Sequence, residues 1–214
     1  MIAYCPLDLP KVMVDEDVVN LLIDTYNPGH HDGIWDTLPL LGKVNSQEDF
    51  LNAKEFEKAW EKRYDYDGII KENILVSDKL KPIFDQFKKL PMQVTHAQIL
   101  RANKNVPKHH DMKHKNGKFI IKGTDYEPNG WKILLNKFEF KSFFICESMD
   151  SEPQYINLPN STNTFVINEK NYPHGSTFVP DKCMVSIFGL VDKVKADNLI
   201  IKSSIRYSDQ VLSF

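Results

Sequence analysis

The stretch Val94-Thr95-His96-Ala97-Gln98-Ile99-Leu100-Arg101 decides the fold class of this chain. Successive side chains of a β-strand point to opposite faces of a sheet. Four residues of the stretch would therefore face one side and four the other, with apolar residues in both sets. This alternation predicts a strand that is buried on at least one face. The run begins just after Pro91, where we expect helices to give way to strands.

Further strand candidates follow at sheet-like spacing, and no helix is predicted among them. Turn signals such as Asn116-Gly117 and Pro128-Asn129-Gly130 separate the candidates. Many short strands with regular turns favour an all-β barrel or sandwich. The predicted strands are residues 118–122, 131–135, 143–146, 155–158, 165–168, 183–191 and 198–207.

Residues 1–90 are interpreted as a largely helical lead-in. Residues 15–26 begin with acidic side chains and place apolar residues at helical spacing. Ser46-Gln47-Glu48-Asp49 resembles a capping box ahead of a second apolar helical face. A third helix is predicted from Ser77 to just before Pro91. No Pro/Gly/Ser-rich linker follows, so we predict one domain, 1–214, with these helices packed on a β core over 91–207.

The composition is that of a globular protein, with 42% hydrophobic and 26% charged residues among 214. A net charge of -2 gives no electrostatic case for nucleic-acid binding. The three cysteines, Cys5, Cys146 and Cys183, form no metal-binding or redox pair, which favours free thiols in a reducing compartment. No apolar run is long enough to span a bilayer, and the first residues do not resemble a secretory signal. We therefore expect a soluble, cytoplasmic protein.

Candidate metal ligands follow the deciding strand in the segment Val106-Pro107-Lys108-His109-His110-Asp111. In an extended segment, His109 and Asp111 point to the same side, while His110 points away. His174 is the only histidine after position 114 and lies in a turn at a strand end. Two imidazoles and one carboxylate on one face of a metal leave its opposite face open, as in non-haem Fe(II) oxygenases. The sequence thus predicts a facial metal triad.

Other interpretations of the histidines stay open at this stage. Three of the seven histidines fall between His109 and His114, as they would in a solvated polar loop. A compact set of His110, Asp111 and His114 is a second candidate for metal binding. The group His30-His31-Asp32 is interpreted as a surface loop, and His96 as a core residue of its strand.

Several motifs of the second half resemble those of 2-oxoglutarate/Fe(II)-dependent oxygenases, most closely the aspartyl/asparaginyl β-hydroxylase-like members. The resemblance covers roughly residues 75–192. It implies a double-stranded β-helix (jelly-roll, cupin-like) core, with 2-oxoglutarate as cosubstrate and Fe(II) bound by His109, Asp111 and His174. It also implies O2 as a reactant and a peptidyl or small-molecule substrate to be hydroxylated. The motifs are residues 98–102, 106–111, 132–136, 163–168, 172–175 and 184–187.

One position departs from the family pattern. Family members usually carry an arginine about ten residues after the second histidine, where this chain has Met184. A thioether cannot form a charge-assisted pair with the far carboxylate of 2-oxoglutarate. Lys182 or Lys132 could supply a point charge instead, with Ser186 as a helper donor. The departure keeps two alternatives open: a cupin-like binding module, and a metal-dependent oxygenase that does not use 2-oxoglutarate.

Aromatic residues on the predicted strands and loops could line a substrate pocket or belong to the core. They are Trp35, Tyr126, Trp131, Phe143 and Phe144.

Overall fold

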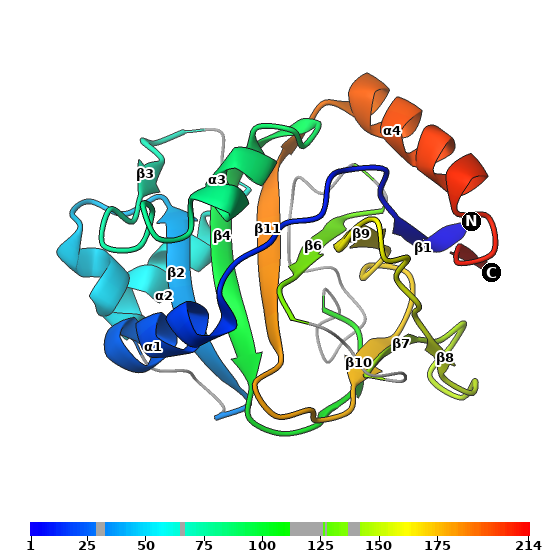
Figure 1. Cartoon of the computed structure of the whole chain (residues 1–214), viewed down its shortest axis with the longest axis horizontal. Coiled ribbons are helices and arrows are strands. Elements are labelled where there is room, and N and C mark those ends of the chain that lie inside the picture. Colours follow the sequence, from blue (N-terminus) through cyan, green and yellow to red (C-terminus); the bar gives the residue numbers. More distant parts are fainter. Residues whose placement is uncertain (29–32, 65–66, 112–125, 127, 137–141) are drawn as a thin grey trace.

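The computed structural model describes residues 1–28, 33–64, 67–111, 126, 128–136 and 142–214. Within these residues the chain forms antiparallel β-sheets flanked by helices (Figure 1). The helices are α1 (Glu16–Tyr26), α2 (Ala53–Glu61), α3 (Lys81–Phe87) and α4 (Lys193–Arg206). The strands are β1 (Ile2–Pro6), β2 (Trp35–Gly42), β3 (Lys71–Glu72), β4 (Met92–Ala102), β5 (Val106–His109), β6 (Gly130–Leu134), β7 (Phe143–Ile145), β8 (Gln154–Tyr155), β9 (Thr164–Ile167), β10 (His174–Ser176), β11 (Cys183–Val191) and β12 (Leu212–Ser213).

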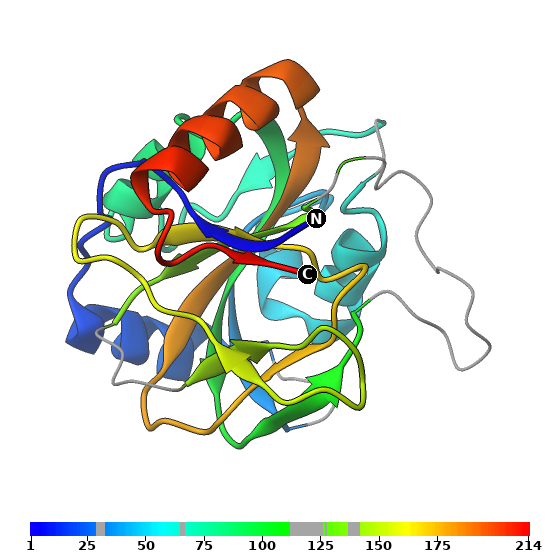
Figure 2. The same ribbon diagram turned by 90° about the vertical axis from the view of Figure 1, so that its right-hand side faces the viewer.

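The strands are arranged in two sheets. The larger has the order β12-β1-β9-β6-β11-β4-β2-β3, and the smaller has the order β5-β10-β7-β8. The deciding strand β4 lies between β2 and β11, and it pairs with β11 along nearly its whole length. The first and last strands, β1 and β12, also pair, which brings the two termini together (Figure 2).

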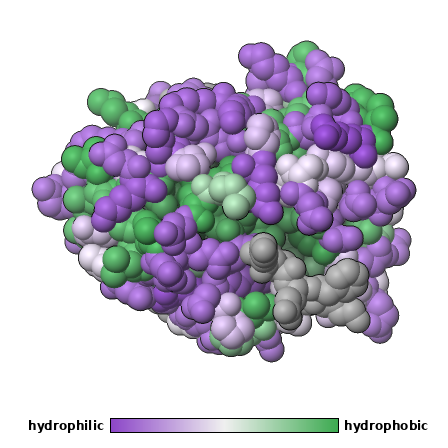
Figure 3. All heavy atoms as spheres, viewed as in Figure 1, coloured by the Kyte–Doolittle hydropathy of each residue, from purple (hydrophilic) through white to green (hydrophobic). Residues whose placement is uncertain are grey.

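One face of the large sheet is covered by helices. Val185 and Ile187 of β11 belong to an apolar core that includes Ile23 of α1, Ile83 of α3 and Ile200 of α4. Figure 1 shows α1 and α3 in front of the strands β2, β4 and β11. The space-filling view from the same side shows hydrophobic side chains in a band between hydrophilic ones (Figure 3). This face is therefore an apolar layer that the helices bury in large part.

The opposite face of the large sheet packs against the small sheet. Met184 alternates with Val185 along β11 and joins a second apolar cluster with Phe165 and Phe143. The rings of Phe143 on β7 and Phe165 on β9 lie 6.1 Å apart between centroids. This cluster connects the two sheets beside the candidate site.

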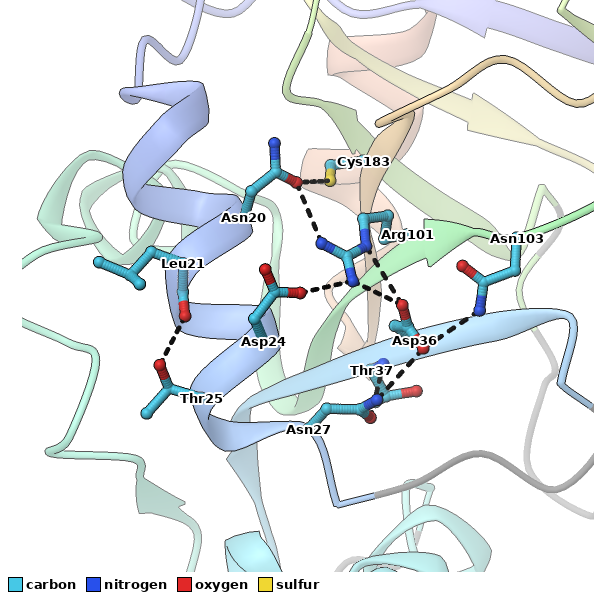
Figure 4. A network of polar contacts seen from close by, with 10 residues as sticks. All are labelled: Asn20, Leu21, Asp24, Thr25, Asn27, Asp36, Thr37, Arg101, Asn103 and Cys183. Carbon is cyan, nitrogen blue, oxygen red and sulfur yellow. Dashed lines mark hydrogen bonds and ion pairs between the residues drawn. The ribbon is translucent and has the colours of Figure 1, made fainter.

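A polar network holds α1 against the edge of the large sheet (Figure 4). Nη2 of Arg101 lies 2.7 Å from Oδ1 of Asp24 on α1 and 2.7 Å from Oδ2 of Asp36 on β2. Asn27, which ends α1, accepts a hydrogen bond from the backbone N–H of Thr37. Burial would raise the pKa of Asp36, but hydrogen bonds from Arg101 and Asn103 outweigh it and lower that pKa.

The predicted helices of the first half are present, with shifted starts. Asp15 caps α1 by accepting hydrogen bonds from the backbone N–H groups of Asp17 and Val18. The capping-box stretch opens a short 3-10 helix, Glu48–Leu51, and Asn52 caps α2. The third helix, α3, begins at Lys81 rather than at Ser77, after a turn.

The description of residues 1–90 as helical needs correction, because β1, β2 and β3 lie there and join the large sheet. In β2 the run Leu38-Pro39-Leu40-Leu41 shows no alternation, since the strand is covered on both faces and its register shifts after Pro39. Such a short apolar run cannot be assigned to a strand by periodicity alone.

The strand predicted at 198–207 is wrong, because these residues lie mainly in α4. Ala196, Ile200 and Ser203 are its buried residues, at spacings of four and three, which is the helical period. Asp192 accepts a hydrogen bond from the backbone N–H of Lys195 and caps the helix. The predicted strand at 118–122 lies outside the described residues.

The prediction of a mainly β protein with helices packed on a β core is confirmed, and the structure shows that the strands of both sheets pair antiparallel. Closure of the sheets into a double-stranded β-helix and the single domain over 1–214 stay predictions. All three cysteines are buried and unpaired, as expected for free thiols. Across the described ranges, every helix is too short or too polar to cross a bilayer.

Candidate metal centre

Strand pairing brings the two predicted histidine ligands together. His109 ends β5, and it is the direct partner of His174 at the start of β10. Residues directly opposite each other in an antiparallel pair have neighbouring side chains, and these two rings lie 4.6 Å apart between centroids. Gly175 permits this close pairing, since a Cβ there would lie 2.7 Å from the carbonyl oxygen of Val106 and 2.6 Å from the ring of Phe144.

Asp111 completes the group two residues after His109. Its Oδ1 lies 2.9 Å from Nε2 of His109 and 3.3 Å from Nε2 of His174. One ligand atom from each of the three residues falls within 4.8 Å of the others. The structure thus assembles the three predicted ligands into a donor set of two nitrogens and one oxygen. Such a set fits a divalent metal such as Fe(II).

The surrounding groups orient the two imidazoles. Nδ1 of His109 lies 2.7 Å from the carbonyl oxygen of Pro107, and Nδ1 of His174 lies 3.4 Å from that of Tyr172. A proton on Nδ1 leaves the lone pair of Nε2 directed at a metal. The ring of Phe143 stacks on His174 at 6.1 Å and 19°.

Charge in the centre favours an ionised carboxylate. Burial opposes ionisation of Asp111, but His174 and the hydrogen bond from His109 outweigh it and hold its pKa well below the ordinary value. Burial likewise disfavours a charged His109, yet the hydrogen bond to Asp111 raises the pKa of that imidazole. Protons and a metal would therefore compete for the same ligand atoms.

A buried ion pair adjoins the group. Nζ of Lys132 lies 2.7 Å from Oε1 of Glu169 and donates a hydrogen bond of 2.8 Å to Oγ of Ser186. The same Oε1 lies 3.9 Å from Nε2 of His174. The side chains of Lys132 and Glu169 are only 5% and 2% exposed. One carboxylate thus connects the lysine to a candidate metal ligand.

Sequence reasoning missed Glu169. Burial raises the pKa of this carboxyl, although Lys132 acts in the opposite direction. The residue begins the turn between β9 and β10, in which the N–H of Tyr172 donates to the carbonyl of Asn168. The sequence signal that could have identified Glu169 is its position five residues before His174, because the turn between them brings both side chains close together.

Lys182, the other lysine considered for the cosubstrate, and Met184, at the usual arginine position, lie in different surroundings. Nζ of Lys182 donates to the carbonyl oxygen of Ser142 at 3.1 Å and lies 5.8 Å from the centre of the Phe143 ring. Burial lowers the pKa of this lysine to about 8. Met184 is buried in the apolar cluster that joins the two sheets.

Phe143 also belongs to the wall of a cavity of about 370 Å³. The cavity is bordered by residues 11–14 and by the apolar side chains of Leu134, Phe165 and Met184. Of the five aromatic candidates, Phe143 alone has a ring contact with a metal-ligand candidate among the described residues. Trp131 is part of the helix-covered core.

A second cation near the centre comes from the part of the chain interpreted as helical lead-in. The guanidinium of Arg63 lies 4.0 Å from the Trp60 ring centre and 5.3 Å from that of Phe188. Nζ of Lys132 lies 5.5 Å from the same Phe188 ring. Burial lowers the pKa of Arg63, and Tyr64 acts against this effect, as do the charges of Asp111 and Glu169. Sequence reasoning missed Arg63 because only the folded chain brings the segment that follows α2 to this face.

The remaining histidine predictions divide into two groups. His96 is fully buried, stacks on Phe56 at 4.9 Å and is a core residue, as predicted. Burial lowers its pKa to about 3. His114 and the group His30-His31-Asp32 lie outside the described residues.

The similarities that this chain shows to known proteins are distant and come from solved structures. No family model matches this chain, and no curated protein matches it. A crystal structure of an oxidoreductase of the 2OG-Fe(II) oxygenase family from Burkholderia pseudomallei is 14% identical, with a TM-score of 0.37, and the match covers 81% of this chain and 77% of that one. A prolyl-4-hydroxylase from Pseudomonas putida is 10% identical, with a TM-score of 0.36, and the match covers 89% of this chain and 92% of that one.

Identities and TM-scores of this size carry no argument about activity, so the residues of the site must carry it. On a scaffold of antiparallel sheets, this chain brings two imidazoles and a carboxylate together in a group that could hold a divalent metal.

Proposed function

We propose that this chain is an Fe(II)- and 2-oxoglutarate-dependent dioxygenase that hydroxylates its substrate. The observation that carries the proposal is the convergence of His109, Asp111 and His174, whose ligand atoms lie within 4.8 Å of one another. Three protein ligands of this kind leave coordination positions for a cosubstrate and O2. Membership of the aspartyl/asparaginyl β-hydroxylase-like group, with a peptidyl or small-molecule substrate, is part of the proposal.

The residues of the chain have distinct tasks in this reaction. His109, Asp111 and His174 hold the metal, and Phe143 covers one side of His174. Bound there together with 2-oxoglutarate and O2, Fe(II) would supply the oxidising chemistry that hydroxylates a C–H bond. The protein orients the reactants and excludes water.

Lys132 is the better candidate for the anchor of the far carboxylate. Its ammonium is buried, bonds to Ser186 and is separated from His174 by one carboxylate. An ammonium can serve as a point charge for a carboxylate. Lys182 instead donates to a backbone carbonyl beside Phe143.

The metal assignment is tested by iron binding under anaerobic conditions. Asp111→Ala should lose bound iron, whereas Asp150→Ala, which removes an exposed carboxylate, should retain it. Circular dichroism of both variants checks that the fold is intact. Equal iron stoichiometry in Asp111→Ala and the unchanged protein would contradict the assignment.

A second candidate function is a metal-dependent oxygenase that does not use 2-oxoglutarate, or a cupin-like binding module. Two observations favour it: Met184 is apolar and buried, and Lys132 already has a carboxylate partner in Glu169. Anaerobic titration of the Fe(II)-loaded protein with 2-oxoglutarate separates the candidates. A saturable charge-transfer absorbance supports the first function, and bound iron without that absorbance supports the second.

A further inference from the structure

The anchor candidate Lys132 is occupied by the chain itself. Its ammonium has two partners in the described structure, Oε1 of Glu169 at 2.7 Å and Oγ of Ser186 at 2.8 Å. A carboxylate at 2.7 Å from an ammonium has the geometry of a charge-assisted hydrogen bond. Glu169 therefore lies where the far carboxylate of a ligand would have to bind if Lys132 were its anchor.

The surrounding backbone makes room for this carboxylate. Gly130 begins β6 two residues before Lys132, and a Cβ there would lie 2.5 Å from Cδ of Glu169. Any larger residue at this position would force the glutamate to move. The absence of a side chain at Gly130 thus permits the observed ion pair.

The ion pair also carries an unsatisfied group. Oε2 of Glu169 is buried and has no hydrogen-bond partner within the described part of the chain. Buried carboxylates lose hydration that one ion pair does not fully replace, and an unsatisfied buried oxygen in a native structure calls for an explanation. A role in selecting what binds beside the metal would provide it.

We infer that Glu169 is a specificity-determining residue, whose carboxylate occupies Lys132 and disfavours ligands that bring a second carboxylate to the metal. This inference rests on the proposed function, in which 2-oxoglutarate reaches its anchor Lys132 only at the expense of the ion pair with Glu169. A 2-oxo acid with one carboxylate needs nothing from Lys132, whereas 2-oxoglutarate must displace Glu169 from it. The centre thus discriminates among 2-oxo acids by the charge at their far end.

The test compares 2-oxoglutarate with pyruvate, which carries the same chelating group but no far carboxylate. The Fe(II)-loaded protein, Glu169→Gln and Glu152→Gln are titrated anaerobically with each acid. Glu152 is exposed, so its variant controls for net charge. We expect Glu169→Gln to bind 2-oxoglutarate at least tenfold more tightly, with pyruvate affinity unchanged and Glu152→Gln like the unchanged protein. Equal 2-oxoglutarate affinity in Glu169→Gln and the unchanged protein, or weaker binding in Glu169→Gln, would overturn the inference.

A second experiment separates this inference from the proposed function. Succinate lacks the chelating 2-oxo group, so its binding to metal-free protein, measured by calorimetry, reports on carboxylate binding without metal chelation. Glu169→Gln should gain succinate affinity, and Lys132→Met/Glu169→Gln should lose that gain. If the protein binds no iron but the gain appears, the proposed function fails and the inference about Lys132 survives. If iron binds and Glu169→Gln gains no succinate affinity, the inference about Lys132 fails and the proposed function survives. Glu169→Met serves as the test variant if circular dichroism shows that Glu169→Gln does not fold.

Discussion

The two faces of the large sheet differ in what they bury, although the same strands build both. On β11, Ile187 points into the helix-covered apolar core, while its neighbour Ser186 bonds to the ammonium of Lys132. Apolar burial stabilises a fold roughly in proportion to area, at about 25 cal/mol per Å². Buried polar groups cost free energy unless they are paired. The helix-covered face therefore contributes stability through apolar burial. On the opposite face, burying the polar groups beside the candidate metal centre costs part of that free energy.

The largest loss of stability should come from breaking the buried ion pair between Lys132 and Glu169. Lys132→Met should lower the free energy of unfolding by about 3–5 kcal/mol, because the carboxylate of Glu169 is left buried without its cation. Urea unfolding at pH 7 measures this loss. The double variant Lys132→Met/Glu169→Met should recover most of it, since no buried charge remains unpaired. A double variant as unstable as the single one would show that the ion pair is not the cause.

Neighbouring residues on β11 provide a matched comparison of the two faces. Ile187→Ala should lose about 2–5 kcal/mol of unfolding free energy, through lost burial and the cavity left behind. Ser186→Ala should lose about 1 kcal/mol, the typical contribution of one hydrogen bond. Denaturant unfolding of both variants gives the two values. Losses of equal size would remove the proposed distinction between the faces.

The pH dependence of stability should report on His96, which is buried among the rings of Phe56 and Phe188. Its pKa of about 3 in the folded protein is below the ordinary value of 6.5. The unfolded chain therefore takes up the proton first, and stability falls as pH drops below that ordinary value, by at most about 1.4 kcal/mol per pH unit. His96→Phe should reduce this fall between pH 7 and pH 5. Parallel curves for the two proteins would argue against a buried neutral imidazole.

The smallest effect is expected at the sheet edge, where Arg101 joins α1 to β2. Arg101→Gln should cost about 1 kcal/mol at pH 7, because ion pairs that are partly solvated contribute little. The pKa of Asp36 is lowered in the folded protein, so its contribution is present above the unfolded pKa and is lost as pH falls through the folded one. The gap between the unchanged protein and the variant should therefore close in acid. Thermal unfolding from pH 7 to pH 2 tests this, and a constant gap would contradict the role of Asp36.

Local patterns predicted much of this fold and the metal group. The acidic start and helical spacing of residues 15–26 identified α1, and strict alternation identified β4. His109 and Asp111 could be paired from their two-residue spacing in an extended segment. These features depend on neighbours in the chain, which is why periodicity shows them.

Other elements lacked a local signal or carried a misleading one. The run at 198–207 is rich in β-branched residues but forms α4, because its buried positions follow the helical period. Residues 35–42 form a strand with little alternation because β2 is covered on both faces. In both cases the surroundings, rather than the intrinsic preference of the residues, decided the structure.

By itself, the sequence determined the donor types, the extended segment that carries His109 and Asp111, and the lack of the usual arginine at Met184. Only the tertiary structure decided that His174 lies opposite His109, that Glu169 reaches Lys132, and that Arg63 approaches the same face. The physical reason is that strand register and helix packing place residues far apart in sequence within a few ångströms of each other. No spacing along the chain encodes those distances.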